Sequence, residues 1–599
     1  MALEQLSDVV QKCQAVQDDS YTAEDYDVFT IAGRACIEEG NSAQVLSIVV
    51  DEKNKDLVRC MGWNLLPPLI QILLKKEDKN LSHCLAILQY LLEACSPKEL
   101  LVGLLEQVEE VHLDTIEETF QLLLNPLQKV LLRLGSRKAS SLGMVLSTLL
   151  EQVAKLPVPQ TKEVSPLCRC CLLLMNFVRP FVHEAKQNLV CSKAEEESPH
   201  QIGKSGDRTL SDKEDELRTE LLKFCMKSLF EPLLKVQLSE PDILPVSPLR
   251  TFATEILSTL TAIGESLPNL VFHPLSKRKE VPGFLEEEVR YPKHALASLA
   301  HLLFVHHLAM DNFPAVFSPV FVLRCNMEHV NLLLSRTEEL WIQKGLELYE
   351  KSLLRTEDGS LSVYLLEIKV FISVPQNLVH VMTLCPELHL RRKGLKVLQL
   401  SIDKLDTEAK YKFFQCLFKV VNHSGVEGYI IKNIKNQIDF SLKPGNGNEW
   451  FEGVHLLPLL CQVFCLPDGP ETDLLQYLDR VMESLNLLRY LLIRDKVTEN
   501  QTGIWTELYK IEDKFLQPLR IGVNMSRAHY EMELKNTVEN KKSKVKEESV
   551  LSVTVDNENL PNMTPESQMQ ALHSALHTFD MIESVLVRIE EITEGKDNP

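Results

Sequence analysis

Helix start signals followed by apolar stripes recur along nearly the whole chain, and they constrain the fold more than any other feature. At Ser96 a serine is followed by a proline and then by a glutamate, a spacing that predicts a capping box. Ser424 and Glu427 repeat this spacing, and Asp406 is a further predicted N-cap. Strand-like alternation is scarce and is best at 550–555. The pattern predicts an all-α protein.

The predicted helices of roughly 12–20 residues are joined by short turns and form pairs of about 40 residues, the period of HEAT and armadillo units. Residues 376–443 show this best, with two helices expected around Pro386 and two more around the turn 422–424. Only 22 of 599 residues are glycine, which is unfavourable inside helices. We therefore expect a HEAT/armadillo-like helical repeat solenoid whose repeats are degenerate, because each unit need only bury one face against its neighbours.

Two polar segments interrupt the helical pattern and suggest domain limits. Residues 191–215 and 534–566 are poor in large apolar side chains, so they cannot bury enough surface to offset their ordering entropy. We expect a flexible acidic and polar linker at the first and a flexible loop at the second. They separate an N-terminal helical repeat region, 1–190, from a C-terminal HEAT-like repeat region, 216–533. A terminal helix over 567–595 is expected to pack back on the array.

Charge and cysteine content restrict the partners and the compartment. The formal net charge is −20 at pH 7, so we expect no binding of nucleic acid through the bulk surface. The first residues lack the basic start and apolar core of a secretory signal, and no apolar run reaches the roughly 18–20 residues of a membrane span. The 15 cysteines are therefore expected to be reduced thiols. The expected compartment is the cytosol, alone or together with the nucleus, without membrane insertion.

Two groups of cysteines could in principle hold a metal ion. Cys168, Cys170 and Cys171 lack the second ligand pair of a zinc site and precede an apolar run, so we interpret them as core thiols. Cys461 and Cys465 lie among leucines and are also expected in the core. Neither group predicts a metal site.

Histidine spacing and the short catalytic and nucleotide-binding motifs also indicate no active site. His573 and His577 have the spacing of two imidazoles that share an ion, but Ser574 stands where a metalloprotease has glutamate, so we expect solvent-facing histidines. The sequence contains no phosphate loop, complete dinucleotide fingerprint or nucleophile elbow. We expect no catalytic residues, no cofactor and no metal. The chain is predicted to be a binding protein and not an enzyme.

One stretch departs from the acidic average. Between Arg391 and Lys443 eleven residues are basic and five are acidic. Solenoids use one face of successive helices as an extended binding surface, and a patch of reversed charge would steer a complementary partner onto it. The alternative is a solvated helix face without a partner.

Several long strings resemble the glomulin family, in the same order and from near residue 50 to near residue 580. They are Met61–Leu65 (MGWNL), Cys95–Leu101 (CSPKELL), Val381–Pro386 (VMTLCP), Asn422–Glu427 (NHSGVE), Ile434–Asp439 (IKNQID), Ser484–Tyr490 (SLNLLRY), Gln501–Leu508 (QTGIWTEL) and Leu572–Leu576 (LHSAL). Because these strings are long and rare, the resemblance is specific and covers essentially the whole chain.

The resemblance implies a HEAT-like, non-catalytic regulator of cullin-RING ubiquitin ligases. Such a protein binds the RING subunit, with its cullin, through the C-terminal half and covers the surface that receives the ubiquitin-conjugating enzyme. The family is also linked to an immunophilin prolyl isomerase, to the hepatocyte growth factor receptor and to vascular development. We therefore expect a ubiquitin ligase inhibitor. The alternative is a cytoplasmic scaffold or adaptor that joins an immunophilin or a receptor tyrosine kinase to signalling partners.

The expected contact residues follow the predicted cap at Ser424. Four isoleucines, at 430, 431, 434 and 438, share one helix face and are expected in the core. Amide and charged side chains project elsewhere, and an aromatic side chain follows in the next turn, a type enriched where interfaces concentrate binding energy. The predicted partner-binding residues are Lys432, Asn433, Lys435, Asn436, Asp439, Lys443 and Trp450. The alternative is that Trp450 packs inward and that the strip is only solvated.

Overall fold

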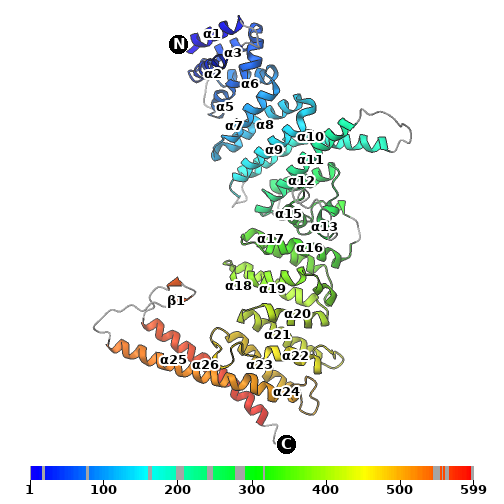
Figure 1. The fold of residues 1–599 in the computed structure, drawn as a ribbon, viewed down its shortest axis with the longest axis vertical. Coiled ribbons are helices and arrows are strands. Elements are labelled where there is room, and N and C mark those ends of the chain that lie inside the picture. The colour runs from blue at the N-terminus through cyan, green and yellow to red at the C-terminus, as the bar shows by residue number, and fades with distance from the viewer. Residues whose placement is uncertain are drawn as a thin grey trace. The chain divides into compact units, whose positions relative to one another are not determined.

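The chain forms stacked helices in two compact units, Met1–Ser352 and Leu353–Pro599 (Figure 1). The computed structural model describes residues 2–15, 21–75, 80–158, 165–196, 208–238, 247–276, 290–313, 317–543, 554–555, 558–559 and 565–594. Consecutive helices pack on one another within each unit, and the predicted all-α helical repeat solenoid is confirmed.

The first unit is built from helices α1 to α17, with short 3-10 turns between several of them. Neighbouring and next-neighbouring helices pack together, for example α1 with α2, α9 with α11 and α10 with α12. The helices are α1 (Ala2–Gln14), α2 (Ala23–Glu38), α3 (Ser42–Val50), α4 (Lys55–Met61), α5 (Leu66–Lys75), α6 (Leu81–Ala94), α7 (Pro97–Glu109), α8 (Ile116–Arg133), α9 (Lys138–Lys155), α10 (Pro166–Glu196), α11 (Arg208–Phe230), α12 (Pro248–Ala262), α13 (Leu267–Ser276), α15 (Lys293–Phe304), α16 (Pro319–Leu334) and α17 (Glu339–Leu354).

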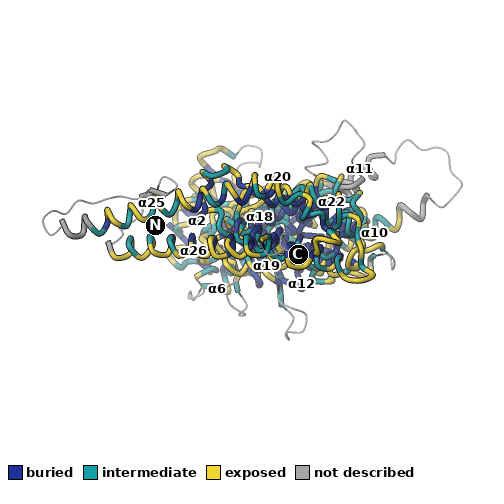
Figure 2. Tube along the Cα trace, turned by 90° about the horizontal axis from the view of Figure 1, so that it is seen from below, coloured by how far each residue is buried: buried dark blue, intermediate teal, exposed yellow. Residues whose placement is uncertain are grey.

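The second unit repeats the pattern with α18 (Val370–Leu384), α19 (Leu388–Lys404), α20 (Thr407–Val420), α21 (Ser424–Ser441), α22 (Gly453–Val463), α23 (Leu478–Arg494), α24 (Ile504–Ile511), a π-helical turn (Glu512–Leu516), α25 (Gln517–Ser543) and α26 (Pro565–Glu594). The breaks near Pro386 and between α20 and α21 fall where the sequence predicts them. Figure 2 shows buried residues inside the stacked helices, whereas α25 and α26 carry exposed residues along much of their length.

The predicted linker is partly helical. α10 continues to Glu196 and α11 begins at Arg208, so both helices extend into 191–215. Glutamate, lysine and arginine favour helix even without an apolar stripe, which accounts for the extension. Residues 197–207 lie outside the described residues. The division between the compact units falls after Ser352, so 216–352, which the sequence analysis grouped with the C-terminal region, belongs to the first unit.

The helices on either side extend into the predicted loop at 534–566. α25 continues to Ser543, and α26 begins at Pro565. Between them, β1 (Thr554–Val555) pairs antiparallel with β2 (Glu558–Asn559), while the other residues lie outside the described part of the chain. The expected terminal helix is present as α26, and it packs along α25 and α23.

The cysteine predictions have mixed outcomes. Cys168, Cys170 and Cys171 are buried as expected, and burial raises the pKa of the Cys170 thiol to about 12. The prediction for Cys461 and Cys465 is wrong, since both are exposed. α22 turns a different set of apolar side chains inward and so leaves Cys461 on its outer side: Leu456, Leu459, Leu460 and Val463. The solvent-facing prediction for the two histidines of α26, His573 and His577, is confirmed.

One stretch, Glu52–Lys75, has the length and apolar composition of a membrane span, among the residues that the structure describes. It consists of short helical segments, and 61% of its most apolar 18 residues are buried inside the first unit. Core helices meet the same test of length and composition, so the stretch is weak support for a membrane span.

Candidate protein interface on the second unit

The core face of α21 is the one predicted from its periodicity. Ile430, Ile431, Ile434 and Ile438 are all 0% exposed. Residues three and four apart lie on one side of a helix, so these side chains form a continuous apolar stripe. Burying each of them contributes about 1.5–3 kcal/mol relative to exposure, which fixes the rotation of α21. The opposite side of the helix is thereby turned outward.

α21 and α23 run parallel and touch closely. A Cβ atom on Gly428 would lie 3.1 Å from the backbone oxygen of Asp479, so the helices approach at this point without a side chain between them. Further along, Tyr490 Oη donates to Asp439 Oδ1 at 2.6 Å. Both pairs are 51 residues apart in sequence, so the helices keep the same register over several turns. They are equivalent helices of successive helix pairs.

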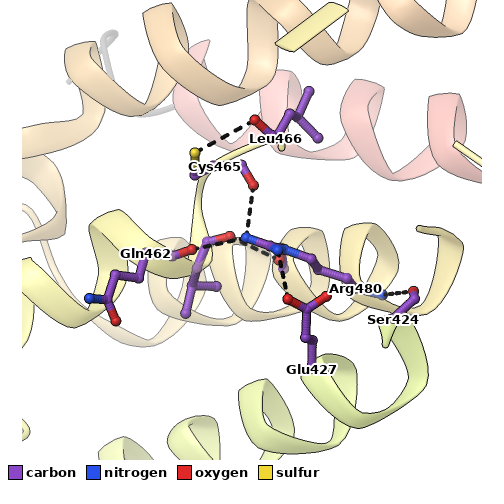
Figure 3. Close-up of polar contacts among 8 residues, drawn as sticks. Ser424, Glu427, Gln462, Cys465, Leu466 and Arg480 are labelled. Carbon is purple, nitrogen blue, oxygen red and sulfur yellow. Dashed lines mark hydrogen bonds and ion pairs between the residues drawn. The ribbon is translucent and has the colours of Figure 1, made fainter. Parts of the chain in front are cut away.

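Arg480 connects α21, α22 and α23 (Figure 3). Its guanidinium donates to Glu427 Oε1 at 2.8 Å and to the backbone oxygens of Gln462 and Cys465, each at 3.2 Å. The Glu427 side chain is 3% exposed and that of Arg480 is 13% exposed. Burial raises the pKa of the Glu427 carboxyl, and the neighbouring arginine opposes this effect. The pair holds the register in which the surface residues of α21 and α23 stand side by side.

The same contacts replace the capping box predicted at the start of α21. The backbone N–H of Arg480 donates to Ser424 Oγ at 3.1 Å, and Glu427 binds the arginine side chain. The helix is preceded by His423, which makes no side-chain capping bond. Arg480 of α23 thus binds both side chains that the predicted capping box would have used, Ser424 and Glu427. At the other predicted capping box, Ser96 makes no side-chain capping bond. The predicted N-cap Asp406 accepts from the N–H of Ala409 at 2.7 Å.

Five of the seven predicted contact residues lie on the outward side of α21 or directly after it and are at least partly exposed. We call them the α21 strip: Lys432, Lys435, Asn436, Asp439 and Lys443. Tyr490 of α23 joins this strip. Lys435 Nζ lies 5.1 Å from the centre of the Tyr490 ring, a cation–π arrangement. Asp439 accepts from the Tyr490 hydroxyl and pairs with Lys443 at 3.1 Å.

Electrostatic effects reinforce this arrangement. The hydrogen bond from Tyr490, followed by that from Lys443, holds the pKa of the Asp439 carboxyl below its ordinary value. Burial, followed by the hydrogen bond to Asp439, raises the pKa of Tyr490 to about 12. At neutral pH the carboxylate of Asp439 and the neutral phenol of Tyr490 therefore stand beside the side chains of Lys435 and Lys443.

The other two predicted contact residues differ from expectation. Asn433 is 3% exposed, and its Nδ2 donates to the backbone oxygen of Tyr429 at 3.0 Å, so it is part of the core and not of the strip. It falls inward because it lies three residues after the buried Ile430, on the same side of the helix. Trp450 is half-buried against Tyr411 and His455, with ring centres 5.3 Å away in each case.

The basic residues of 391–443 do not all share one face. Lys404 is 7% exposed and pairs with Asp358 at 2.7 Å. Lys412 Nζ lies 5.5 Å from the centre of the Trp450 ring. The excess of positive charge is thus divided between structural contacts and separate surface patches.

A cavity of about 590 Å³ opens beside the C-terminal ends of α21 and α23. Three bases and three carboxylates are among the residues that line it: Lys443, Arg494, Lys496, Glu452, Asp495 and Glu499. Each carboxylate is paired within the chain, to the donors Asn448, Thr502 and Lys496 respectively. The cavity is therefore suited to hydrogen-bonding groups of another molecule and not to a metal ion.

Sequence reasoning missed three residues of this region. Tyr490, Arg494 and Arg480 all belong to α23 and reach the α21 region only through the parallel packing of the two helices. The resemblance string at 484–490 includes Tyr490 but gives no indication of its partner. A local pattern cannot show a pairing of residues 51 positions apart.

The fold and this surface define a helical repeat protein with a polar, aromatic surface that spans successive helices. A family model described as "Uncharacterised protein family, YAP/Alf4/glomulin" matches residues 1–575. Glomulin of Homo sapiens is 48% identical over 606 residues, covering 100% of this chain and 98% of that protein. Glomulin of Mus musculus is 47% identical over 609 residues with the same coverage of both proteins. The chain belongs to the glomulin family.

Proposed function

We propose that the protein is a non-catalytic inhibitor of cullin-RING ubiquitin ligases in the cytosol or nucleus. It binds the RING subunit through the second unit and so prevents the ubiquitin-conjugating enzyme from docking. Membership of the glomulin family supports this proposal, as does the α21 strip. Inhibition then follows occupancy alone, because a bound protein excludes a competitor for the same surface without any chemical step.

The observation that carries the proposal is the arrangement around Tyr490. Lys435 and Asp439 of α21 both contact this tyrosine of α23, beside the 590 Å³ cavity. Tyrosine and arginine are enriched where interfaces concentrate their binding energy, and a concave site lets them contact a partner away from water. Because Arg480 fixes the register of the two helices, the surface is formed before the partner binds, which lowers the entropic cost of association.

Charge reversal on the α21 strip tests the site. A Lys432→Glu/Lys435→Glu variant should bind the isolated RING subunit at least about tenfold more weakly, as expected when charges at the contact oppose the partner. Lys419→Glu on α20, also an exposed lysine of this unit, is the matched control and should bind like the wild type. Calorimetric titration gives the affinities, and thermal melting shows whether the variants fold. Equal affinity of the double variant and the wild type would exclude the strip as the contact.

A scaffold or adaptor is the second candidate, and the division into two compact units favours it, since each unit could hold its own partner. Crosslinking of the full-length protein to an immunophilin and a RING subunit together discriminates between the two functions. An adaptor should give crosslinks from the two partners to different units at the same time. An inhibitor should give crosslinks from the RING subunit to the second unit, with inhibition unaffected by the immunophilin.

A further inference from the structure

α19 presents an exposed face on which apolar and basic side chains alternate. Leu388 and Leu395 are 49% and 40% exposed, and Arg391 and Arg392 lie between them. These positions follow the spacing i, i+3, i+4, i+7, so they share one side of the helix. The opposite side is buried through a regular stripe: Leu390, Gly394, Val397, Leu398, Ser401 and Ile402. We call the outward side, Leu388 to Leu395 with the two arginines, the α19 face.

The end of the preceding helix, α18, adds a further exposed leucine close to α19 in sequence. Leu384, at the end of α18 and four residues before Leu388, is 73% exposed. α18 and α19 pack closely, because a Cβ atom on Gly394 would lie 3.1 Å from Met382 Cγ. Three exposed leucines near one helix corner are unusual, since exposed apolar side chains are normally scattered singly.

The charge of the α19 face is one-sided. Residues 388–402 contain four basic residues besides His389 and no acidic residue, although the whole chain has a net charge of −20. Glu387, directly before α19, lies 3.7 Å from His389 at the start of the helix. A basic partner would be repelled here, and acidic groups on either side of an apolar stripe would be attracted.

The α19 face also continues towards the α21 strip. Gln399, one turn beyond Leu395, accepts a hydrogen bond from the hydroxyl of Tyr429 on α21. Solenoids bind extended partners along such successive helices. An amphipathic helix that docks on such a surface presents apolar anchors at i, i+3, i+4 and i+7.

From these observations we propose that the α19 face docks an acidic amphipathic helix of a partner protein. Its apolar stripe packs on Leu388 and Leu395, and its glutamates or aspartates bind Arg391 and Arg392. Arginine suits this role because its planar guanidinium can bind a carboxylate through two hydrogen bonds. The site is distinct from the α21 strip, so it does not depend on RING binding.

Fluorescence anisotropy of the full-length protein with a labelled, designed peptide tests the proposal. The peptide, about 18 residues or five helical turns long, carries leucines on one face and glutamates beside them. A control peptide has the same composition with the leucines distributed around the helix. Saturable binding of the first peptide and at least about tenfold weaker binding of the second are expected, because only the first has a continuous apolar stripe.

Variants of the chain locate the contact. Arg391→Glu/Arg392→Glu and Leu388→Ser/Leu395→Ser should each weaken binding at least about tenfold, whereas Arg391→Lys/Arg392→Lys, which keeps the charge, should retain most of it. The matched control is Lys419→Glu/Val420→Ser, an exposed charged and apolar pair on α20, and it should bind like the wild type.

Three results of the peptide assay would overturn the proposal. They are no saturable binding of the acidic peptide, equal binding of the control peptide, and equal loss in the α20 control variant. Self-association of the wild type that the leucine variant abolishes would also overturn it, because the occupant would then be a second copy. Since no ligase is present in the assay, these outcomes are independent of the proposed inhibition.

Discussion

The guanidinium of Arg480 lies 2.8 Å from the carboxylate of Glu427, and the two residues join helices that are neighbours in the stack but 53 residues apart in sequence. Glu427 Oε2 and Arg480 Nε are buried and have no hydrogen-bond partner in the described part of the chain. The hydrogen bonds of the pair therefore offset only part of the free energy that its removal from water costs. Its evident effect is to specify which turn of α23 faces which turn of α21.

Removing one member of this pair should be costly. Arg480→Ala leaves the Glu427 carboxylate buried without its partner, which we expect to destabilise the second unit by about 3–5 kcal/mol. Replacing both residues by methionine should cost clearly less, because no buried charge remains. Hydrogen exchange of α21 and α23 measures the effect locally. As a control, Arg527→Ala removes only surface pairs, with Asp580 and Glu583, and should cost about 1 kcal/mol or less. A small effect of Arg480→Ala, similar to that of the control, would contradict this account.

His329 should make the first unit sensitive to acid. The side chain is 2% exposed and its Nε2 donates to the backbone oxygen of Val271 at 3.0 Å. Burial lowers its pKa to about 4, against about 6.5 when unfolded. The unfolded chain therefore binds more protons between these values, and stability falls as the pH drops from about 6.5 towards 4.

We expect this histidine to remove about 2 kcal/mol of stability between pH 7 and pH 5. His329→Gln should reduce the pH dependence of the unfolding midpoint of the first unit by a corresponding amount. His306, whose pKa burial lowers to about 3, acts in the same direction and remains in the variant. An unchanged pH dependence in the variant would show that His329 is not buried in its neutral form.

Gly522 should not tolerate a methyl group although it lies in a helix. Alanine normally stabilises a helix interior by about 0.5–1 kcal/mol relative to glycine. At this position, however, a Cβ atom would lie 2.9 Å from the backbone oxygen of Pro470, so α25 would have to move away from that turn. We expect Gly522→Ala to destabilise the second unit by about 1–3 kcal/mol, as overpacking does.

The matched control is Asn524→Ala, at an exposed position of the same helix, which should be neutral or slightly stabilising. Thermal melting of the two variants gives the comparison. A higher melting temperature for Gly522→Ala than for the wild type would show that α25 does not rest on the turn at Pro470.

Much of the fold could be predicted from local sequence. The period of 3.6 residues places the four isoleucines of α21 in the core, because burying them is worth more than any competing arrangement of that helix. Pro386 and Asp406 mark helix ends for equally local reasons: proline disfavours a helical conformation in the residue before it, and aspartate accepts from the first free N–H groups.

The candidate interface was less predictable because it depends on partners distant in sequence. Ser424 and Glu427 have capping-box spacing, yet both bind Arg480 of α23 instead. Ser424 accepts from the backbone N–H of Arg480, and Glu427 binds its charged guanidinium, which offers stronger hydrogen bonds than a backbone N–H. The sequence pattern predicts Asn433 on the surface, but it lies in the core, because a polar side chain can be buried when its own helix accepts its hydrogen bond. No local sequence pattern marks Tyr490, and it lies beside Asp439 only because α23 packs parallel to α21.

The central claim is that the protein inhibits cullin-RING ligases by occupying the RING subunit through the α21 strip. The most direct test is ubiquitin transfer by a reconstituted cullin-RING ligase titrated with the full-length protein. We predict that transfer falls to background near one equivalent of protein per RING subunit. The Lys432→Glu/Lys435→Glu variant should require at least about tenfold more protein, and Lys419→Glu should act like the wild type. Undiminished transfer at saturating wild-type protein would contradict the claim.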